Sequence, residues 1–469
     1  MVFSSFLFIF GFLPIFLLSY FLCPKRYRNL AALIFSYGFY AWGAPKIVPV
    51  LFLSSVFDYL LVGRLGNSEP KRKSLICAIG VLCNVGLLAY YKYANFFVAQ
   101  LDLMGFENSN WVAVVLPIGI SFFTFQKISY IVDVYRGVSS AADNLFDYLL
   151  YVVLFPQLIA GPILRYQDME KQIRSRDHSM ELFLYGSVRF MLGLSKKILL
   201  ANEMGAVANN VFGLSEQGLS TGYAWLGAIC YAFQVYFDFS GYSDMAIGLC
   251  AMMGFLIPEN FRMPYSSSSI TEFWRRWHIS LSSWMREYLY IPLGGSRCSR
   301  IKTARNLWLV FLISGFWHGA SWTFIAWGAL HGLLLSIERV AGSFTSFRLP
   351  RLLAVFLTWV LLLITWVLFR AKTFSAAYQH LVTQFSFSEA INPPALGFVM
   401  HERGTAVFIV CCLIVLVSLS KRIASRVEAL QSYPLEKPFA CFGFAYAALF
   451  ISVITLATTA FNPFIYFRF

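Results

Sequence analysis

Long apolar runs without charged residues recur along the whole chain and predict its main elements. A helix needs about 20 apolar residues to cross the ~30 Å hydrocarbon layer of a bilayer. Runs of this kind, some short or interrupted by glycine, lie at residues 3–22, 29–45, 47–63, 74–91, 113–132, 180–200, 222–238, 243–257, 306–318, 321–338, 351–369, 404–420 and 438–460. Backbone polar groups in lipid have to be satisfied within the segment, so runs this long and closely spaced favour helices over barrel strands. We predict an all-α, polytopic membrane protein with roughly 11–13 helices.

Composition supports this class of protein. The 469 residues are 58% hydrophobic and only 13% charged, which excludes an ordinary soluble globule. The nine cysteines include no C-x-x-C pair, so they are interpreted as packing residues and not as a disulfide framework or a metal site. No internal repeat, low-complexity linker or nucleotide-binding loop divides the chain. We predict a single transmembrane domain over residues 1–469.

The basic excess, 37 Lys and Arg against 23 Asp and Glu, is concentrated between the apolar runs, which argues against a nucleic-acid surface. The clusters lie at residues 25–28, 64–73 and 421–426. The positive-inside rule predicts that these segments are cytoplasmic. The N-terminus, with no charge before Lys25, is then predicted to lie outside. A basic start and a small-residue cleavage site are both absent, so the first run is expected to stay as an anchor.

The apolar stretch at residues 148–163 does not fit a simple crossing. It is short and contains Pro156, Gly161 and Pro162, yet a basic loop follows at residues 165–176. If the stretch crossed the membrane, that loop would lie outside, against the positive-inside rule. A re-entrant segment removes the conflict, and such irregular backbone is tolerated only where it is buried in protein or lines a cavity. We therefore predict a central funnel or tunnel.

The densest polar region, residues 260–305, predicts an amphipathic helix. Ser269 and Glu272 form a capping-box pattern at its start, and Pro292 marks its end. One apolar stripe on this helix would combine Trp274, Trp277, Leu281, Trp284 and Tyr288. A second stripe, about 80° wide at ~100° per residue, would combine Arg275, His278, Ser282 and Arg286. An interfacial helix and a helix lining a polar cavity both fit this pattern.

His318 lies in an apolar run at residues 307–335 that contains no Asp, Glu, Lys or Arg. Ionisable groups at membrane depth are costly and usually face a cavity or a partner, which favours a functional role. The alternative is a neutral imidazole that is hydrogen-bonded to a neighbouring helix beside Trp317 and Trp322. His331 would lie about 20 Å further along a continuous helix and is expected to be structural.

Asp238 and Asp244 are two further polar groups in apolar surroundings, with no cation nearby in sequence. Each could cap a helix around Gly241 and meet solvent. Alternatively, each could orient a histidine or an arginine across a cavity.

Two segments carry a resemblance to a known family: TEFWRRWHISLSSWMREYLYIPLGG from Thr271 and GFWHGASWTFIAWGALHG from Gly315. They resemble the membrane-bound O-acyltransferase family, most closely its bacterial alginate O-acetyltransferase branch. That branch includes the membrane subunit of peptidoglycan O-acetylation and, more distantly, the D-alanyl transfer protein of teichoic acids. Similar stretches begin at Leu116, Ala160 and Phe233, so the resemblance covers nearly the whole chain.

The resemblance implies a helical bundle around a funnel or tunnel that transfers an acyl group from a cytoplasmic thioester to a hydroxyl. The family's two marked histidines correspond to His278 and His318. We expect His318 to be the catalytic general base, and His278 to polarise the thioester carbonyl or position a substrate. The expected donor- or substrate-binding residues are Arg275, Arg276, Arg286, Arg297, Asp238, Asp244, Trp274 and Trp317. Headgroup anchoring is the alternative role of the four arginines. No residue is assigned to oxyanion stabilisation.

In this branch the donor is expected to be acetyl-CoA, used as a substrate with no bound cofactor. The acceptor is expected to be an extracytoplasmic acetyltransferase, another acceptor protein of the pathway, or a glycan. The location implied is the bacterial inner membrane, with lipids as neighbours and no nucleic acid as partner. Three alternatives stay open: D-alanyl transfer from a carrier protein toward teichoic acid, a transporter, which would be expected to show paired halves, and a non-catalytic scaffold.

Overall fold

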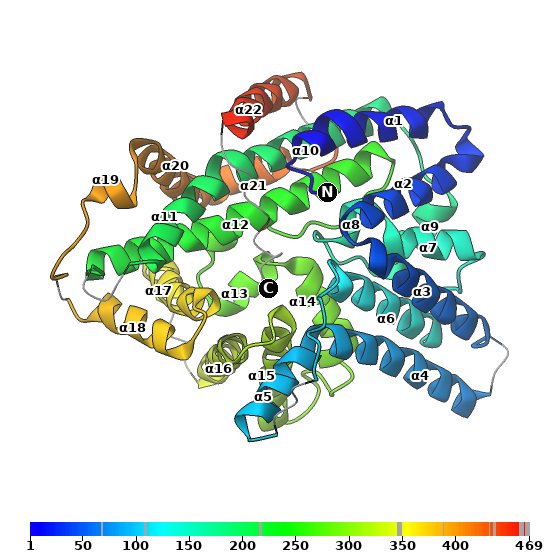
Figure 1. Cartoon of the computed structure of the whole chain (residues 1–469), viewed down its shortest axis with the longest axis horizontal. Coiled ribbons are helices and arrows are strands. Elements are labelled where there is room, and N and C mark those ends of the chain that lie inside the picture. The colour runs from blue at the N-terminus through cyan, green and yellow to red at the C-terminus, as the bar shows by residue number, and fades with distance from the viewer. Residues whose placement is uncertain are drawn as a thin grey trace. The chain divides into compact units, whose positions relative to one another are not determined.

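The computed structural model describes residues 1–66, 69–106, 110–214, 218–344, 349–387, 389–430, 432–434, 438–458 and 464. These residues form helices and connecting segments, with no strand among them, so the all-α prediction is confirmed (Figure 1). They divide into two compact units. Unit 1 combines Met1–Gly186 with Ala246–Pro258, and unit 2 combines Ser187–Met245 with Glu259–Phe469.

Unit 1 holds the N-terminal helices. They are α1 (Leu13–Leu22), α2 (Arg28–Gly43), α3 (Val48–Gly63), α4 (Pro70–Leu88), α5 (Ala94–Leu103), α6 (Ile120–Tyr135), α7 (Leu145–Val153), α8 (Phe155–Leu158) and α9 (Tyr166–Arg174). α6 is its central helix, because nearly all of its side chains are buried. Lys127 of α6 is neutralised by Asp58 of α3 at 3.2 Å, and Asn84 of α4 donates to the same carboxylate. A buried charge is tolerated only with such a partner.

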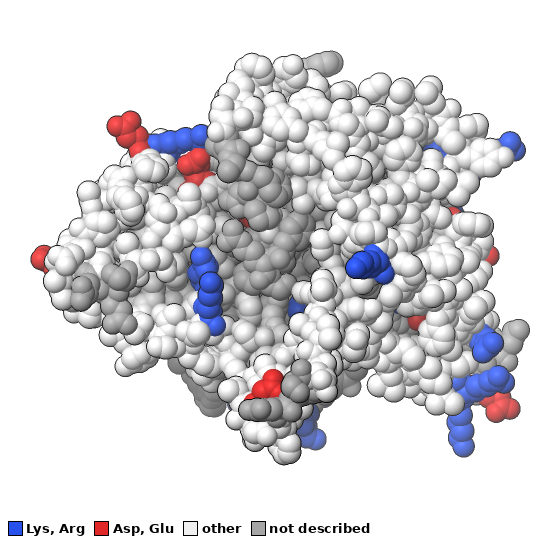
Figure 2. All heavy atoms as spheres, viewed as in Figure 1, with Lys and Arg blue, Asp and Glu red and all other residues white. Residues whose placement is uncertain are grey.

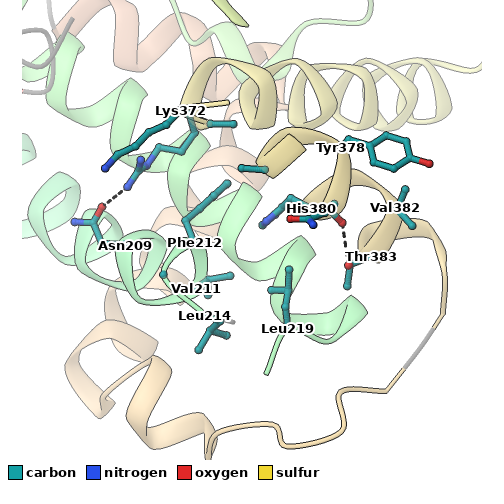
Figure 3. A pocket seen from close by; sticks show the side chains of 15 residues that line it. Asn209, Val211, Phe212, Leu214, Leu219, Lys372, Tyr378, His380, Val382 and Thr383 are labelled. Carbon is teal, nitrogen blue, oxygen red and sulfur yellow. Dashed lines mark hydrogen bonds between the residues drawn. The ribbon is translucent and has the colours of Figure 1, made fainter. Parts of the chain in front are cut away.

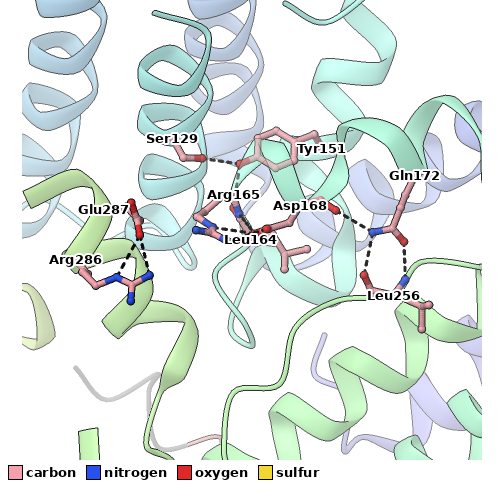
Figure 4. Close-up of polar contacts among 9 residues, drawn as sticks. All are labelled: Ser129, Tyr151, Leu164, Arg165, Asp168, Gln172, Leu256, Arg286 and Glu287. Atoms are coloured by element: carbon pink, nitrogen blue, oxygen red, sulfur yellow. Dashed lines mark hydrogen bonds and ion pairs between the residues drawn. The ribbon is translucent and has the colours of Figure 1, made fainter. Parts of the chain in front are cut away.

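The stretch that was predicted to be re-entrant is broken and buried in unit 1. α7 and α8 are only 9 and 4 residues long and are separated by Leu154, whose backbone is not helical (φ -52°, ψ 111°). Residues 148–164 are buried throughout. The backbone is fixed by side chains: Tyr151 donates to the carbonyl of Leu164 at 2.9 Å, and Gln172 of α9 donates to that of Leu256 (Figure 4). Neither helix reaches the length needed to cross a bilayer.

Unit 2 holds the remaining helices. They are the end of α10 (Met180–Ser195), α11 (Asn202–Phe212), most of α12 (Thr221–Met252), α13 (Ile270–Arg276), α14 (Ile279–Met285), α15 (Arg300–His318), α16 (Trp322–Phe344), α17 (Arg351–Arg370), α18 (Phe374–Phe385), α19 (Leu396–Val399), α20 (Glu402–Ser418), α21 (Lys421–Leu430) and α22 (Pro438–Thr458).

α12 is one continuous helix of 32 residues where two spans, at residues 222–238 and 243–257, were predicted. Gly241 does not break it, because this glycine serves close packing against α10. A Cβ on Gly241 would lie 2.6 Å from the carbonyl oxygen of Gly193, and a Cβ on Gly193 would lie 2.5 Å from that of Gly241. Small residues allow helix backbones to approach in this way. Of the two roles left open for Asp238 and Asp244, capping a helix at this point is therefore excluded.

α15 and α16 form a tight hairpin (Figure 1). The turn between them comprises only residues 319–321. Gly315 and Gly328 meet at the crossing, where a Cβ on either one would lie 2.3 Å from a carbonyl oxygen of the partner helix. The chain thus reverses directly after His318. His331 returns beside α15 and does not lie further along the same helix.

Four described helices are long and apolar enough to cross a membrane: Pro45–Gly63, Pro70–Leu103, Arg351–Arg370 and Ala440–Thr458. The bent pair α20 and α21 provides a fifth if it is counted as one span. On the face shown in Figure 2, neutral side chains predominate and charged ones occur in small separate groups. These features are those of a membrane protein.

Candidate active site

α13 begins as the sequence predicts. The side chain of Ser269 accepts from the backbone N–H of Glu272 at 3.0 Å. Glu338 of α16 adds a second cap, because its carboxylate accepts from the backbone N–H groups of Ile270 and Thr271 at 2.6 and 2.8 Å. A negative charge is favourable at a helix N-terminus. The start of α13 is therefore held against α16.

The single amphipathic helix predicted after Ser269 is interrupted at His278. α13 ends at Arg276, His278 adopts the left-handed conformation (φ 43°, ψ 53°), and α14 starts at Ile279. That conformation costs a non-glycine residue about 1–2 kcal/mol and needs support from its surroundings. The second predicted stripe does not exist, because His278 is fully buried while Arg275 and Arg286 are exposed.

Asn260 supports the break through its backbone and its side chain. Its carbonyl accepts from the N–H of Ile279 at 3.0 Å. Its side-chain oxygen accepts from the Ser280 hydroxyl at 2.8 Å and the Ser280 backbone N–H at 3.3 Å. The side-chain amide donates to Ser243 of α12 at 3.1 Å. This set of contacts fixes the orientation of the amide.

The same oxygen decides the tautomer of His278. It lies 3.1 Å from His278 Nδ1 and already accepts from Ser280, so Nδ1 has to be the donor. Nε2 then carries the lone pair, and it is buried with no hydrogen-bond partner among the described residues. Burial lowers the pKa of His278 to about 3, so the ring is neutral at physiological pH. As a neutral ring, His278 accepts at Nε2 and cannot donate there.

His318 is the last residue of α15 and lies inside an aromatic cage. It is 5% exposed, and its ring centroid lies 4.8 Å from that of Trp317, 5.2 Å from Trp327 and 5.4 Å from Phe369. The tight turn at Gly319 brings Trp327 of α16 against it, which places a titratable ring where little water enters. Such surroundings strengthen electrostatic interactions with any polar group that reaches the ring.

The structure brings four of the predicted site residues into one cluster within unit 2. Trp317 contacts His318 directly, and its ring centroid lies 6.4 Å from that of His278. Trp274 donates from Nε1 to His331 Nδ1 at 3.2 Å. The rings of His318 and His331 both contact Trp327, at 5.2 and 4.8 Å.

Asp238 and Asp244 form buried ion pairs. Asp238 pairs with Lys197 at 2.8 Å, and Asp244 pairs with Arg189 and Lys196. Arg189 also binds Glu259 at 2.6 Å and is itself 1% exposed. Glu259 precedes Asn260, and Asp244 follows the Ser243 that accepts from Asn260, so this network anchors both sides of the Asn260 contacts.

The four predicted donor-binding arginines lie at the surface, away from full burial. Arg276 pairs with Glu272 at 2.9 Å, and Arg286 pairs with Glu287 at 2.8 Å (Figure 4). Arg275 and Arg297 are exposed. Surface ion pairs of this kind contribute little to stability, so these guanidinium groups can exchange their carboxylates for other anions.

A cavity of about 530 Å³ lies among α11, α17 and α18 (Figure 3). Its lining includes Arg370, Lys372 and His380. His380 stacks on Phe212 at 4.3 Å, and its Nε2 donates to the carbonyl of Ala224 at 3.0 Å. Neither of the two family histidines lines this cavity. Among the described residues there is also no group of three His, Cys, Asp or Glu side chains placed to hold a metal ion.

Comparison with known proteins decides the family. The membrane-bound O-acyltransferase family model matches residues 140–378, which contain both family histidines. The chain is 48% identical to the probable alginate O-acetylase AlgI of Pseudomonas aeruginosa over 393 residues, 82% of this chain and 75% of the relative. The chain belongs to the membrane-bound O-acyltransferase family. It is an enzyme, an O-acyltransferase, and the predicted resemblance is confirmed.

Two other relatives are named for other transfer reactions. The peptidoglycan O-acetyltransferase of Helicobacter pylori is 35% identical over 100% of this chain and 98% of its own length. The teichoic acid D-alanyltransferase of Streptococcus thermophilus is 32% identical over 53% of this chain and 63% of its own length. The similarity to the acetyl-transferring relatives thus extends further along the chain.

Two residues of the candidate site were missed in the sequence. Arg189 lies inside the apolar run at residues 180–200, with no other charged residue between Glu181 and Lys196, and the cost of charge at membrane depth was a signal that could have identified it. Asn260 offered no such signal. Its role depends on residues 243 and 278–280, which only the folded chain brings together.

Asn260→Asp is expected to move the acid limb of the pH–rate profile to higher pH. A carboxylate next to Nδ1–H stabilises the imidazolium and raises the pKa of His278, so the neutral ring is lost earlier as the pH falls. The measurement is kcat/KM for acyl transfer as a function of pH. Asn209→Asp is the control. Asn209 accepts a partly buried hydrogen bond from Arg370 in unit 2, away from His278, so this variant should leave the acid limb in place. An unshifted limb in Asn260→Asp would contradict the role of neutral His278.

Proposed function

We propose that this O-acyltransferase moves an acetyl group from cytoplasmic acetyl-CoA across the bacterial inner membrane, for O-acetylation of an extracytoplasmic polysaccharide. The observation that carries the proposal is the buried cluster of His278, Trp317 and His318 in unit 2. It places a lone pair at His278 Nε2 and a second imidazole in one water-poor site. Acyl transfer to a hydroxyl needs a base in such a site.

The α15–α16 hairpin supports a through-membrane orientation. One end of the hairpin carries Arg300, Lys302, Arg305 and Arg339, while the turn at residues 318–322 carries no Lys or Arg. The positive-inside rule assigns the basic end to the cytoplasm. At 1.5 Å per residue, α15 then carries His318 about 27 Å away from its cytoplasmic start. The same rule, applied to the basic clusters along the chain, gives a topology in which the N-terminus lies outside and the stretch at residues 148–163 re-enters without crossing.

In the proposed reaction His318 takes the proton of the acceptor hydroxyl. The hydroxyl oxygen forms a bond to the acetyl carbonyl carbon, the C–S bond of the thioester breaks, and the proton passes to the departing thiolate. Imidazole suits both transfers near neutral pH. His278, as a neutral acceptor, is better suited to hold a hydroxyl or thiol proton than to polarise the carbonyl. It therefore positions a substrate in this scheme.

The surface arginines are proposed to attract the phosphates of acetyl-CoA. Arg297 lies close in sequence to the basic start of α15, which the same orientation places in the cytoplasm. Guanidinium groups bind phosphate oxygens in a bidentate manner. Arg275 and Arg297 are exposed, whereas Arg276 and Arg286 would exchange a glutamate for the donor.

The acceptor is proposed to be a hydroxyl of an extracytoplasmic partner protein or glycan. The extended similarity to the alginate and peptidoglycan O-acetylases supports acetyl transfer over D-alanyl transfer, because the D-alanyltransferase relative matches 53% of this chain. D-alanyl transfer would use a carrier protein as donor. A donor assay with acetyl-CoA alone distinguishes the two.

Labelled acetyl-CoA supplied only to the cytoplasmic face of oriented liposomes is expected to label an acceptor enclosed on the opposite face. Coenzyme A is too polar to cross the bilayer, so label on the far side requires passage of the acetyl group through the protein. The measurement is acceptor-bound label over time, with lumenal coenzyme A checked as a leak control. Labelling that needs donor and acceptor on the same face would contradict the transfer of the acetyl group across the membrane.

A further inference from the structure

His331 is locked in one tautomer by its neighbour. Trp274 Nε1 is a donor only, and it lies 3.2 Å from His331 Nδ1, which therefore accepts. In the neutral ring the proton then sits on Nε2. His331 is 0% exposed, so its Nε2–H is a fully buried donor, the opposite polarity to that of His278 Nε2.

This donor has no hydrogen-bond partner among the described residues. Trp327 also has an unsatisfied donor. It is 1% exposed, and its Nε1–H is buried without a partner in the part of the chain described. Buried donors are satisfied in the great majority of cases, and an unsatisfied one costs about 1–3 kcal/mol. Two adjacent unsatisfied donors, with ring centroids 4.8 Å apart, point to a polar ligand group that occupies this place during function.

The position of the Trp327 and His331 donors indicates which ligand group they bind. The ring of Trp327 contacts both His331 and the proposed base His318, at 4.8 and 5.2 Å. When a hydroxyl attacks an acyl carbonyl, negative charge develops on the carbonyl oxygen, which hydrogen-bond donors in a water-poor site stabilise. Neutral His278 cannot serve, because its free ring nitrogen is an acceptor.

We propose that Trp327 Nε1–H and His331 Nε2–H bind the carbonyl oxygen of the acyl group as it passes His318. This inference rests on the proposed function and adds the oxyanion-stabilising residues to it. As the hydroxyl oxygen bonds to the carbonyl carbon, the C=O π pair moves onto the carbonyl oxygen and is held by the two donors. When the C=O bond re-forms, the thiolate leaves with the C–S electron pair and takes the proton from His318.

Trp274 acts as a positioning residue in this arrangement. It holds the proton of His331 on Nε2 by donating to Nδ1. Trp274→Phe keeps an aromatic ring but removes this donor, so the two His331 tautomers become accessible. The effect is then expected in kcat, with little change in KM, because substrate contacts in the ground state are retained.

The test compares Trp327→Phe, His331→Phe and His331→Gln in acetyl transfer from labelled acetyl-CoA. The two phenylalanine variants remove one donor each and are expected to lower kcat about 10²–10³-fold with little change in KM. Glutamine retains an N–H donor and should recover part of the rate. Trp225→Phe is the matched control, because Trp225 Nε1 already donates to the carbonyl of Gln384 at 2.8 Å. Its kcat should stay near the wild-type value.

Size-exclusion chromatography and thermal unfolding in detergent verify that each variant is folded. ¹⁵N-histidine NMR of the wild type provides a second readout that does not depend on turnover, and it should show His331 protonated on Nε2. Folded phenylalanine variants with wild-type kcat, or His331 protonated on Nδ1, would overturn the inference while acetyl transfer by the wild type stands. A wild type that transfers no acetyl group would instead overturn the proposed function, and this inference with it.

Discussion

His318→Ala is expected to abolish acyl transfer while the protein still inserts and purifies as a folded, monodisperse species. A general base contributes about 10²–10⁴-fold to a rate, and alanine leaves no group that can take the hydroxyl proton. His318 ends α15 and contacts its aromatic cage through its ring edges and faces, so the helix hairpin is held mainly by other residues. The measurement is turnover with labelled acetyl-CoA, together with size-exclusion chromatography and thermal unfolding.

The matched control for this loss is another buried histidine of unit 2. His380 is 5% exposed and donates to the carbonyl of Ala224, but it lies outside the cluster around His318. His380→Ala should lower thermal stability and leave turnover per folded molecule near the wild-type value. His278→Ala should reduce transfer severely without necessarily abolishing it. Joint loss of folding and activity in His318→Ala would favour a structural role for this residue.

Gly315→Ala and Gly328→Ala are expected to destabilise unit 2 strongly and to reduce acyl transfer with it. At each position an added Cβ would lie 2.3 Å from a backbone carbonyl oxygen of the partner helix, so α15 and α16 would have to move apart. Overpacking of this kind typically costs about 1–3 kcal/mol, occasionally more, and backbone atoms cannot change rotamer to relieve it. The same separation would draw Trp327 away from His318.

Thermal unfolding in detergent measures this effect. Gly443→Ala in α22 is the matched control, because no atom lies within 4 Å of an added Cβ there. Alanine has the higher helix propensity, by about 1 kcal/mol, so this control should be neutral or slightly stabilising. Wild-type unfolding temperatures for Gly315→Ala and Gly328→Ala would contradict the close crossing of the two helices.

Several features followed from the sequence because they depend on neighbouring residues alone. The apolar runs at residues 47–63, 74–91, 351–369 and 438–460 match four helices of span length within a few residues at most ends. Partitioning of an apolar run into lipid is a property of its own composition. The Ser269 cap and the family motifs around His278 and His318 were equally local, so the order of residues along the chain was enough to identify the family and the candidate histidines.

Other features depended on contacts between distant residues. The periodicity after Ser269 predicted one helix, but Asn260 binds the backbone and ring at His278 and stabilises a left-handed residue that local propensity disfavours. Gly241 looked like a helix break, yet it lies against Gly193 and allows α12 to continue. In both cases a partner more than fifteen residues away in sequence outweighed the local preference.

The polarity of the site was decided only by the tertiary structure. The sequence near Asp238 and Asp244 contains no cation that could pair with them. In the folded chain, α10 and the segment after it supply the cations Arg189, Lys196 and Lys197. From the sequence, His331 was expected to have only a structural role. The sequence could not show that the chain reverses after His318 and returns the His331 ring to the side of α15. A histidine's tautomer depends on which atom faces each nitrogen, and no property of the residue or its neighbours in sequence contains that information. Composition and spacing therefore determined the class of protein and the residues available for chemistry, whereas packing determined which nitrogen accepts and which donates.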